Sequence, residues 1–320
     1  DAYYAYNFNK PATADQPYLV SMSRHNEFNI NLAFIDVKYS SPRVRARVVP
    51  GFGTYINANY VREVGSLKNL IEANAGVRIA KSKNIWLDVG IVGSPYTNES
   101  AISKDHLAYT RSLAAENVPY YLSGVKLTVP VSPKIITYLY LVNGWQQITD
   151  DNSNKSVGTQ LEYRPGKHLL LNWNTYIGEE KVLRDSTESI RYFSDIYAIY
   201  NNGPFSATSC VYYGVQEMAN KKVTWLQANI ISRYSVTPLL STTIRMEYFK
   251  DNDGVLVIPV TKRDHFESYG ISLGLNLKLD DNILFRTEAR QLFSDKQIFF
   301  DDGVESRKSL TLTGGVCAWF

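Results

Sequence analysis

Apolar and polar residues alternate along many short segments of this chain. Between residues 269 and 278, Tyr, Ile and Leu side chains alternate with Gly, Ser, Asn and Lys. A period of two places the two sets on opposite faces of a β-strand. The pattern predicts 16 strands, most of them near the roughly 9–11 residues that a tilted strand needs to cross a bilayer. The predicted strands are 2–8, 27–39, 43–62, 73–80, 84–92, 119–130, 134–145, 156–164, 168–178, 189–200, 203–215, 222–235, 238–249, 266–278, 282–293 and 307–320.

Short and long connections alternate between these segments. The short ones, such as Arg164–Lys167 and Asn201–Pro204, carry Pro, Gly and Asn residues that favour turns. Short periplasmic turns opposite long extracellular loops are typical of outer-membrane barrels. We therefore predict an all-β fold, a transmembrane antiparallel β-barrel that forms one domain over residues 1–320, with both ends on the periplasmic side. A soluble β-sandwich or solenoid would share the alternation within strands, but not the alternation of loop lengths.

The composition narrows the class of protein further. The mean hydropathy is −0.23, and no apolar run approaches the roughly 18 residues of a membrane-spanning helix. The 23 tyrosines suit the aromatic girdles of a membrane barrel. A net charge of +3 without a Lys/Arg-rich run argues against nucleic acid as a partner. No CxxC or His-rich spacing is present, so we expect neither a metal nor a cofactor.

Both ends of the chain have strand-like patterns. The first residues, DAYYAYNF, already alternate, and we expect a mature form without a leader. The last strand ends in Phe320, with Ala318 two residues and Gly315 five residues before it. This spacing is similar to the terminal signal that the outer-membrane assembly machinery reads in barrel proteins. A terminal aromatic side chain also suits the periplasmic interface of the membrane.

Several stretches of the first two-thirds of the chain resemble one protein family. They are YYAYNFNKP, RHNEFNINLAFI, EANAGVRI, KNIWLDVGI, ESAI, YTRSLAAENVPYYLSGVKL and LYLVNGWQ. They are similar to the OmpL-like putative β-barrel porins of Bacteroidota, and the similarity is most specific in residues 72–145. The resemblance implies a channel-like outer-membrane protein, and it brings no catalytic residue with it.

The third long connection, residues 93–118, is the longest on its side. In general porins with 16 strands the third extracellular loop folds into the lumen, and by analogy we expect the same here. Glu99, Lys104, Asp105 and Arg111 are then the candidate constriction residues. Residues 103–117 suit a short helix with Ser103 as its N-cap. The alternative is a loop that only covers the outer mouth.

Strand parity predicts which charged side chains face the lumen. The main candidates are Arg43, Arg45, Arg47, Arg78, Arg245, Glu247, Arg286, Glu288 and Arg290. The same parity adds Lys126, Arg164, Arg191, Arg233, Lys278, Asp88, Glu162 and Asp195. Twelve cations against five carboxylates leave a net lumen charge of about +7, which would concentrate anions in a low-dielectric channel. The alternative is that these charges pair across strands and only stiffen the wall.

These features lead to one functional hypothesis and one alternative. We expect a porin for passive diffusion of small hydrophilic solutes with a weak anion preference, because 16 strands can enclose an aqueous channel. The alternative is a non-conducting accessory barrel of a larger outer-membrane complex. The four histidines lack a nucleophile motif such as GxSxG, so we do not expect an enzyme. The expected partners are membrane lipid and lipopolysaccharide, the assembly machinery, and either two further copies in a homotrimer or a larger complex.

Overall fold

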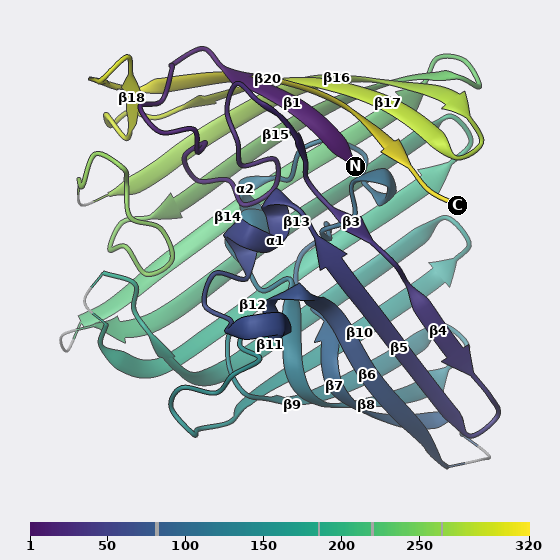
Figure 1. Cartoon of the computed structure of the whole chain (residues 1–320). Helices are drawn as coiled ribbons and strands as arrows, with labels where there is room; N and C mark the ends of the chain where they lie inside the picture. Colours follow the sequence, from purple (N-terminus) through teal and green to yellow (C-terminus); the bar gives the residue numbers. More distant parts are fainter. Residues whose placement is uncertain (81–82, 185, 219–220, 264) are drawn as a thin grey trace.

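The chain folds into a nearly closed antiparallel β-barrel (Figure 1). The computed structural model describes residues 1–80, 83–184, 186–218, 221–263 and 265–320. The barrel strands are β1 (Ala2–Asn7), β2 (Phe28–Ile30), β3 (Ala33–Phe34), β4 (Val37–Ser40), β5 (Val44–Phe52), β6 (Leu70–Ala80), β7 (Ile85–Gly93), β8 (Tyr121–Ser132), β9 (Ile135–Val142), β10 (Ser156–Gly166), β11 (Leu169–Lys181), β12 (Glu188–Asn202), β13 (Phe205–Met218), β14 (Lys221–Ser235), β15 (Leu240–Asp251), β16 (Phe266–Asp280), β17 (Ile283–Phe293) and β20 (Lys308–Ala318). Among the described residues, no helix has the length and apolarity to cross a membrane.

Each strand from β5 to β17 pairs with the next one along the chain, and β20 pairs with both β17 and β1. The segment 28–40 closes the wall, because β2 pairs with β1 whereas β3 and β4 pair with β5. The sheet has 18 strands, and β2, β3 and β4 are short strands that follow one another along the segment 28–40. The predicted fold class is confirmed, and the predicted strand number is close to the observed one.

The predicted strand 43–62 is wrong in its second half, since β5 ends at Phe52 and the helix α1 (Thr54–Asn59) follows. Gly53 causes the turn, with a φ of 136° that favours glycine. A Cβ at this position would lie 2.3 Å from the carbonyl oxygen of Asn31. The same oxygen accepts a hydrogen bond from the Tyr55 N–H, which fixes the start of the helix.

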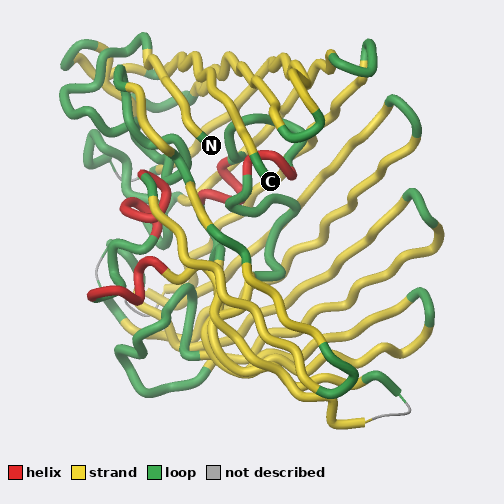
Figure 2. The backbone as a smooth tube through the Cα atoms, turned by 45° about the vertical axis from the view of Figure 1, so that its right-hand side comes forward, coloured by secondary structure: helices red, strands yellow, loops and turns green. Residues whose placement is uncertain are grey.

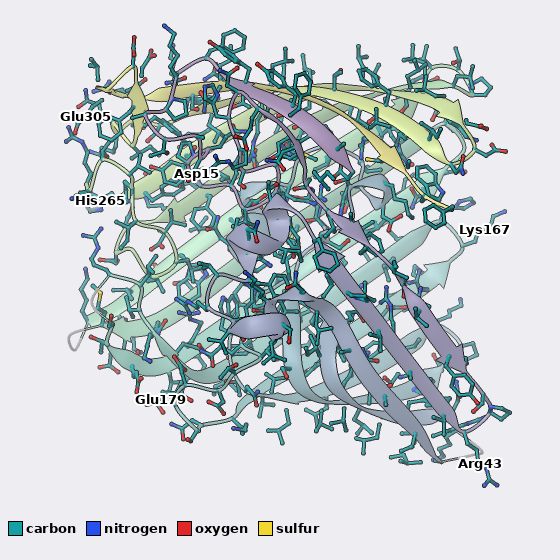
Figure 3. All side chains as sticks on the ribbon, viewed as in Figure 1. Asp15, Arg43, Lys167, Glu179, His265 and Glu305 are labelled. Carbon is teal, nitrogen blue, oxygen red and sulfur yellow. The ribbon has the colours of Figure 1, made fainter. Side chains whose placement is uncertain are left out.

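Long loops gather at one end of the barrel and short turns at the other (Figure 2). Asp15, Glu179, His265 and Glu305 mark the long-loop end, whereas Lys167 marks the short-turn end (Figure 3). The last long loop contains a separate hairpin of β18 (Phe299–Asp301) and β19 (Val304–Ser306). This arrangement confirms the predicted alternation of loop lengths.

The two faces of the wall differ as the alternation predicts. On β16, Leu273 and Leu275 are exposed on the outer face, as lipid-facing residues should be, whereas Ser272 and Asn276 are buried on the inner face. The largest apolar cluster lies inside the barrel near the long loops and is rich in aromatic rings. Its members include Tyr96, Leu113, Trp145, Tyr176, Phe193, Tyr212, Trp225, Phe249 and Phe266. The interior at this end is therefore packed like a protein core.

Candidate functional site

The third long loop, residues 94–120 and called L3 below, connects β7 with β8 and bonds to inward-facing side chains of β15 and β17. It contains the 3-10 helix η2 (Ser103–Asp105) and the α-helix α2 (Leu113–Glu116), which contacts β14 and β15. The single helix expected from Ser103 onward is wrong, because the two short helices are separate. The intervening carbonyl groups of His106 and Leu107 bond to the wall residue Arg286 instead of to helical N–H groups.

Carboxylates on the wall accept backbone N–H groups of L3. Glu288 on β17 binds the N–H of Thr110 at 2.8 Å and its hydroxyl at 2.9 Å. Glu247 on β15 binds the N–H of Leu113 at 2.6 Å. These bonds satisfy loop donors that would otherwise be buried without partners. L3 therefore has a fixed seat on the wall.

Arginines on the same part of the wall complete this seat. Arg245 donates to the carbonyl oxygen of Thr110 at 2.8 Å and pairs with Glu288 at 2.6 Å. Arg290 pairs with Glu247 at 2.7 Å. All four charged side chains are almost fully buried. We call Arg245, Glu247, Arg286, Glu288 and Arg290 the L3 seat. These residues face inward and are buried, and L3 lies over them.

Two of the four expected constriction residues, Glu99 and Arg111, are buried within L3. Arg111 has no exposed surface and donates to the carbonyl oxygens of Ser100 and Ala101. Glu99 accepts hydrogen bonds from the N–H and hydroxyl of Ser112, and burial raises the pKa of its carboxyl group. Both side chains hold the loop in shape.

The other two expected constriction residues, Lys104 and Asp105, stay partly exposed. They form a salt bridge of 2.5 Å with each other. Lys104 also lies over the ring of Trp319, with its Nζ 5.6 Å from the ring centre. Of the four predicted constriction residues, solvent can therefore reach the charged groups of Lys104 and Asp105.

Most of the remaining inward cations already have partners. Arg45 donates two hydrogen bonds to Asp88, and Arg47 pairs with Asp36 and Glu72. Arg78 donates to the carbonyl oxygen of Pro42 on the neighbouring turn. Arg43 lies in the bend before β5 and is exposed at the short-turn end (Figure 3). Arg43 is therefore outside the strand on which the sequence prediction placed it.

Lys126 and Arg233 differ from these residues. Within the described ranges, neither has a carboxylate at salt-bridge distance. Asp88 lies opposite Lys126 in the sheet, but its carboxylate binds Arg45. Both side chains are only partly buried. Among the predicted inward cations, these two combine a partly exposed side chain with the lack of a carboxylate at salt-bridge distance in the described ranges.

Sequence reasoning missed the loop carboxylates that tie the long loops together. Glu116 of L3 accepts the N–H groups of Val20 and Ser21 from the first long loop, residues 8–27 and called L1 below. Burial raises the pKa of Glu116 to about 7. Glu63 likewise binds the Tyr121 hydroxyl and the N–H of Ile148. No spacing in the sequence distinguishes these residues from solvated loop acids.

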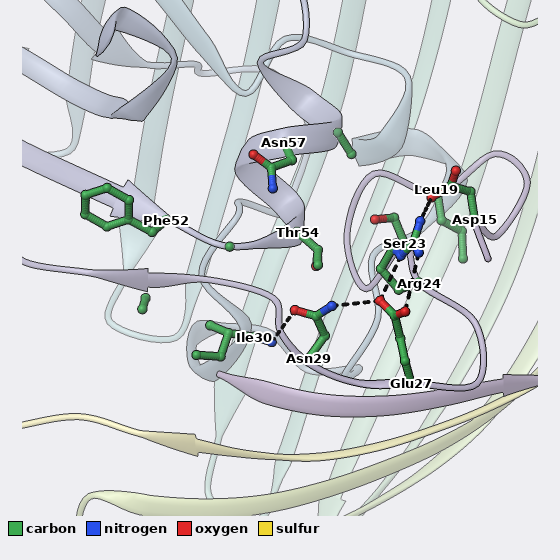
Figure 4. A pocket seen from close by; sticks show the side chains of 13 residues that line it. Asp15, Leu19, Ser23, Arg24, Glu27, Asn29, Ile30, Phe52, Thr54 and Asn57 are labelled. Atoms are coloured by element: carbon green, nitrogen blue, oxygen red, sulfur yellow. Dashed lines mark hydrogen bonds and ion pairs between the residues drawn. The ribbon is translucent and has the colours of Figure 1, made fainter. Parts of the chain in front are cut away.

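A pocket of about 720 Å³ lies between L1 and α1 (Figure 4). Its basic residue, Arg24, pairs with Asp15 at 2.6 Å and with Glu27 at 2.8 Å. Thr54 and Asn57 contribute polar groups from α1. The charge of Arg24 is therefore already compensated, and the pocket is not the expected anion path.

Of the three residues of the predicted assembly signal, Gly315 and Ala318 lie in β20, and Phe320 follows it. Ala318 and Phe320 are exposed, whereas Gly315 faces inward beside Tyr109 and β1. A Cβ at Gly315 would lie 2.1 Å from the Tyr109 hydroxyl oxygen and 2.3 Å from the carbonyl oxygen of Ala2. Packing thus gives Gly315 a role that is independent of any signal.

Comparisons with known proteins agree with this architecture. The barrel is similar to the outer membrane channel DcaP of Acinetobacter baumannii, with a TM-score of 0.65 and 10% identity over 99% of this chain and 94% of that one. It is equally similar to an anion-selective porin from Comamonas acidovorans, with a TM-score of 0.65 and 10% identity over 100% of this chain and 97% of that one. The trimer form of OmpT of Vibrio cholerae gives a TM-score of 0.62 and 11% identity over 100% of this chain and 98% of that one. At these identities the similarity shows the fold.

The search of curated proteins found no match. A family model, described as putative beta-barrel porin-2, OmpL-like, matches residues 1–320. The family match, together with the barrel and its lipid-facing exterior, places the protein in the outer membrane. The chain belongs to the OmpL-like β-barrel porin-2 family.

Proposed function

We propose that this barrel lets small hydrophilic solutes diffuse passively across the outer membrane, with a weak preference for anions. The observation that carries this proposal is the pair of inward cations, Lys126 and Arg233, without a salt bridge among the described residues. Uncompensated positive charge in a low-dielectric channel raises the local concentration of anions. Charged groups along a pore set its selectivity.

L3 is the proposed constriction of this pathway. It is seated on β15 and β17, so that it narrows the lumen from one side. Lys104 and Asp105 are the members of the predicted constriction set that remain exposed on it. Because they pair with each other, their net effect on selectivity is small, and Lys126 and Arg233 dominate.

The test is conductance of the purified protein in planar bilayers under a KCl gradient. Discrete steps and a reversal potential that favours chloride are the expected result. A reversal potential that favours potassium would reject the anion preference. We propose no enzymatic activity, and lipase and protease assays on the same preparation test this point.

The alternative is a non-conducting accessory barrel in a larger outer-membrane complex. One observation favours it: on many neighbouring strands, the inward side chains near the long loops are buried and fill the interior. Examples are Val92, Leu122, Tyr140, Tyr176, Phe193, Tyr212, Trp225, Phe249 and Leu292. Silent bilayers, together with co-purification of other barrels, would support this alternative.

We propose a homotrimer as the assembly of the conducting form. The support is that OmpT of Vibrio cholerae, one of the structural neighbours, has a trimer form. Lipid and lipopolysaccharide cover the exposed apolar exterior in this proposal, and the assembly machinery recognises Gly315, Ala318 and Phe320. The native mass in mild detergent, determined by light scattering, separates a monomer from a trimer or a larger complex.

A further inference from the structure

Arg286 on β17 contacts residues 103–107 of L3 through its terminal guanidinium nitrogens. Its side chain has no exposed surface. Its Nε donates to Asn276 Oδ1 on β16 at 2.6 Å. Its terminal nitrogens donate to the carbonyl oxygens of Ser103 at 2.5 Å, His106 at 3.1 Å and Leu107 at 2.7 Å. One wall residue therefore holds three carbonyl groups of the loop.

The charge of Arg286 is compensated differently from that of its neighbours. Arg245 and Arg290 each form salt bridges with wall carboxylates. In the parts of the chain that are described, no carboxylate lies at salt-bridge distance from Arg286. Its charge is compensated instead by the dipoles of the loop carbonyl groups and by the ring of Tyr109, whose centre lies 5.4 Å from the guanidinium carbon. The compensation of this buried charge thus depends on L3 being in position.

The imidazole of His106 does not compete with Arg286 for the same role. Burial, followed by the charges of Arg111 and Arg286, holds the pKa of His106 well below its usual value. The ring is therefore neutral at physiological pH, and its carbonyl group is the part that binds Arg286. The cation that fixes this stretch of L3 is the one supplied by β17.

We propose that Arg286 is a positioning residue that sets the width of the pore by holding residues 103–107 of L3 against the wall. Its charge does not act on solutes, because L3 covers it. A lysine cannot replace it, since an ammonium group is a compact point charge that lacks the planar fork needed for several separated acceptors. Without the guanidinium, the three carbonyl groups lose their donors and L3 loses its seat.

Arg233 is the matched control for this proposal. It is also an inward cation, on β14, but its side chain makes no hydrogen bond or salt bridge within the described residues. Arg286→Met and Arg233→Met therefore remove the same charge and similar volume from the same interior. Only the first variant removes a contact with L3.

The experiment measures trypsin cleavage at Arg111 of the refolded protein in lipid vesicles, together with pore size from the passage of graded sugars. Arg111 is fully buried, so the wild type resists cleavage. We expect Arg286→Met to speed cleavage by about tenfold or more and to admit larger sugars, because opening of L3 becomes easier. Arg233→Met should retain the wild-type resistance to trypsin and shift only the reversal potential.

Two further variants keep the test decisive if Arg286→Met impairs folding. Trypsin should cleave Arg286→Lys nearly as fast as Arg286→Met. Asn276→Ala should be cleaved at an intermediate rate, because it removes the side chain that accepts the hydrogen bond of the Arg286 Nε. Urea unfolding midpoints show whether the barrel itself is intact. If the Arg286 variants resist trypsin like the wild type at an unchanged midpoint, the proposal is overturned. If they are cleaved but pass the same sugars, Arg286 holds L3 without setting pore width, which also overturns it.

The inference rests on the proposed function only for its pore-size readout. If the wild type does not conduct, the porin proposal fails, whereas the trypsin result still decides whether Arg286 positions L3.

Discussion

Arg245 and Glu288 form an ion pair inside the barrel, with nitrogen and oxygen 2.6 Å apart and no exposed surface on either side chain. Both also bind the same loop residue. Arg245 donates to the carbonyl oxygen of Thr110, and Glu288 accepts its N–H. The pair therefore joins β15, β17 and L3. Removal of either partner would leave the charge of the other one buried without its counter-charge.

Glu288→Ala should lower the free energy of unfolding by about 3–5 kcal/mol, since it leaves the Arg245 guanidinium buried without its main counter-charge. Replacing both side chains with Met should recover much of this loss, because a buried ion pair is often no more stable than well-packed apolar groups. Urea unfolding of the refolded barrel in detergent, followed by tryptophan fluorescence, provides the measurement. A double variant as unstable as Glu288→Ala would contradict this account.

The orientation of these side chains was predictable, whereas their partners were not. A period of two requires Arg286, Glu288 and Arg290 to share a face, and they do. The ion pair with Arg245 depends on strand register across 43 residues, and the contact with Thr110 spans 178. Local pattern carries no information on such contacts. The alternation therefore predicts which side chains face inward, but not which of them L3 covers.

The end of β5 shows a second kind of limit. The apolar and polar pattern continues past Gly53, so that it predicts a strand to residue 62. The chain instead turns at Gly53, whose φ of 136° favours glycine, and a Cβ there would collide with the Asn31 carbonyl oxygen. L3 was placed in the lumen by analogy alone, and its seat became identifiable only from the hydrogen bonds of its backbone.

Lys126→Glu should shift the selectivity towards cations, because Lys126 is an inward cation that no described carboxylate pairs with. The measurement is the reversal potential in a KCl gradient. Lys167→Glu makes the same charge change at the exposed turn before β11 and should have a much smaller effect (Figure 3), since exposed charges are screened over about 8–10 Å. Equal shifts in both variants would mean that selectivity reflects net charge and not the lumen.

The contact between L1 and L3 should weaken as the pH rises through about 7. Burial raises the pKa of Glu116 to about 7, so the fold favours its protonated form. The pKa of such a group is higher in the folded protein than in the unfolded chain. It therefore stabilises the fold fully at a pH below the unfolded-state pKa. This contribution is lost as the pH rises through the folded-state pKa. Glu116→Gln mimics the protonated form and should remove this dependence.

Hydrogen exchange of the Val20 and Ser21 amides, corrected for intrinsic rates, measures this contact because both N–H groups bind Glu116. The wild type should protect them more at pH 5 than at pH 8. Glu116→Gln should protect them equally at both values. Greater protection of the wild type at pH 8 would show that the carboxylate, and not the acid, holds L1.

Gly315→Ala separates the packing role of this glycine from the proposed assembly signal. The new methyl group would lie 2.1 Å from the Tyr109 hydroxyl oxygen and 2.3 Å from the Ala2 carbonyl oxygen, so that β1 or L3 must move. Such overpacking costs about 1–3 kcal/mol. Gly314→Ala is the matched control, because its nearest neighbour would be the Thr287 methyl group at 3.6 Å. If packing dominates, Gly315→Ala lowers the urea midpoint of protein refolded without any cellular machinery, and Gly314→Ala does not. If Gly315 acts only as a signal, the refolded variant is as stable as the wild type, and the loss appears solely as reduced insertion in cells.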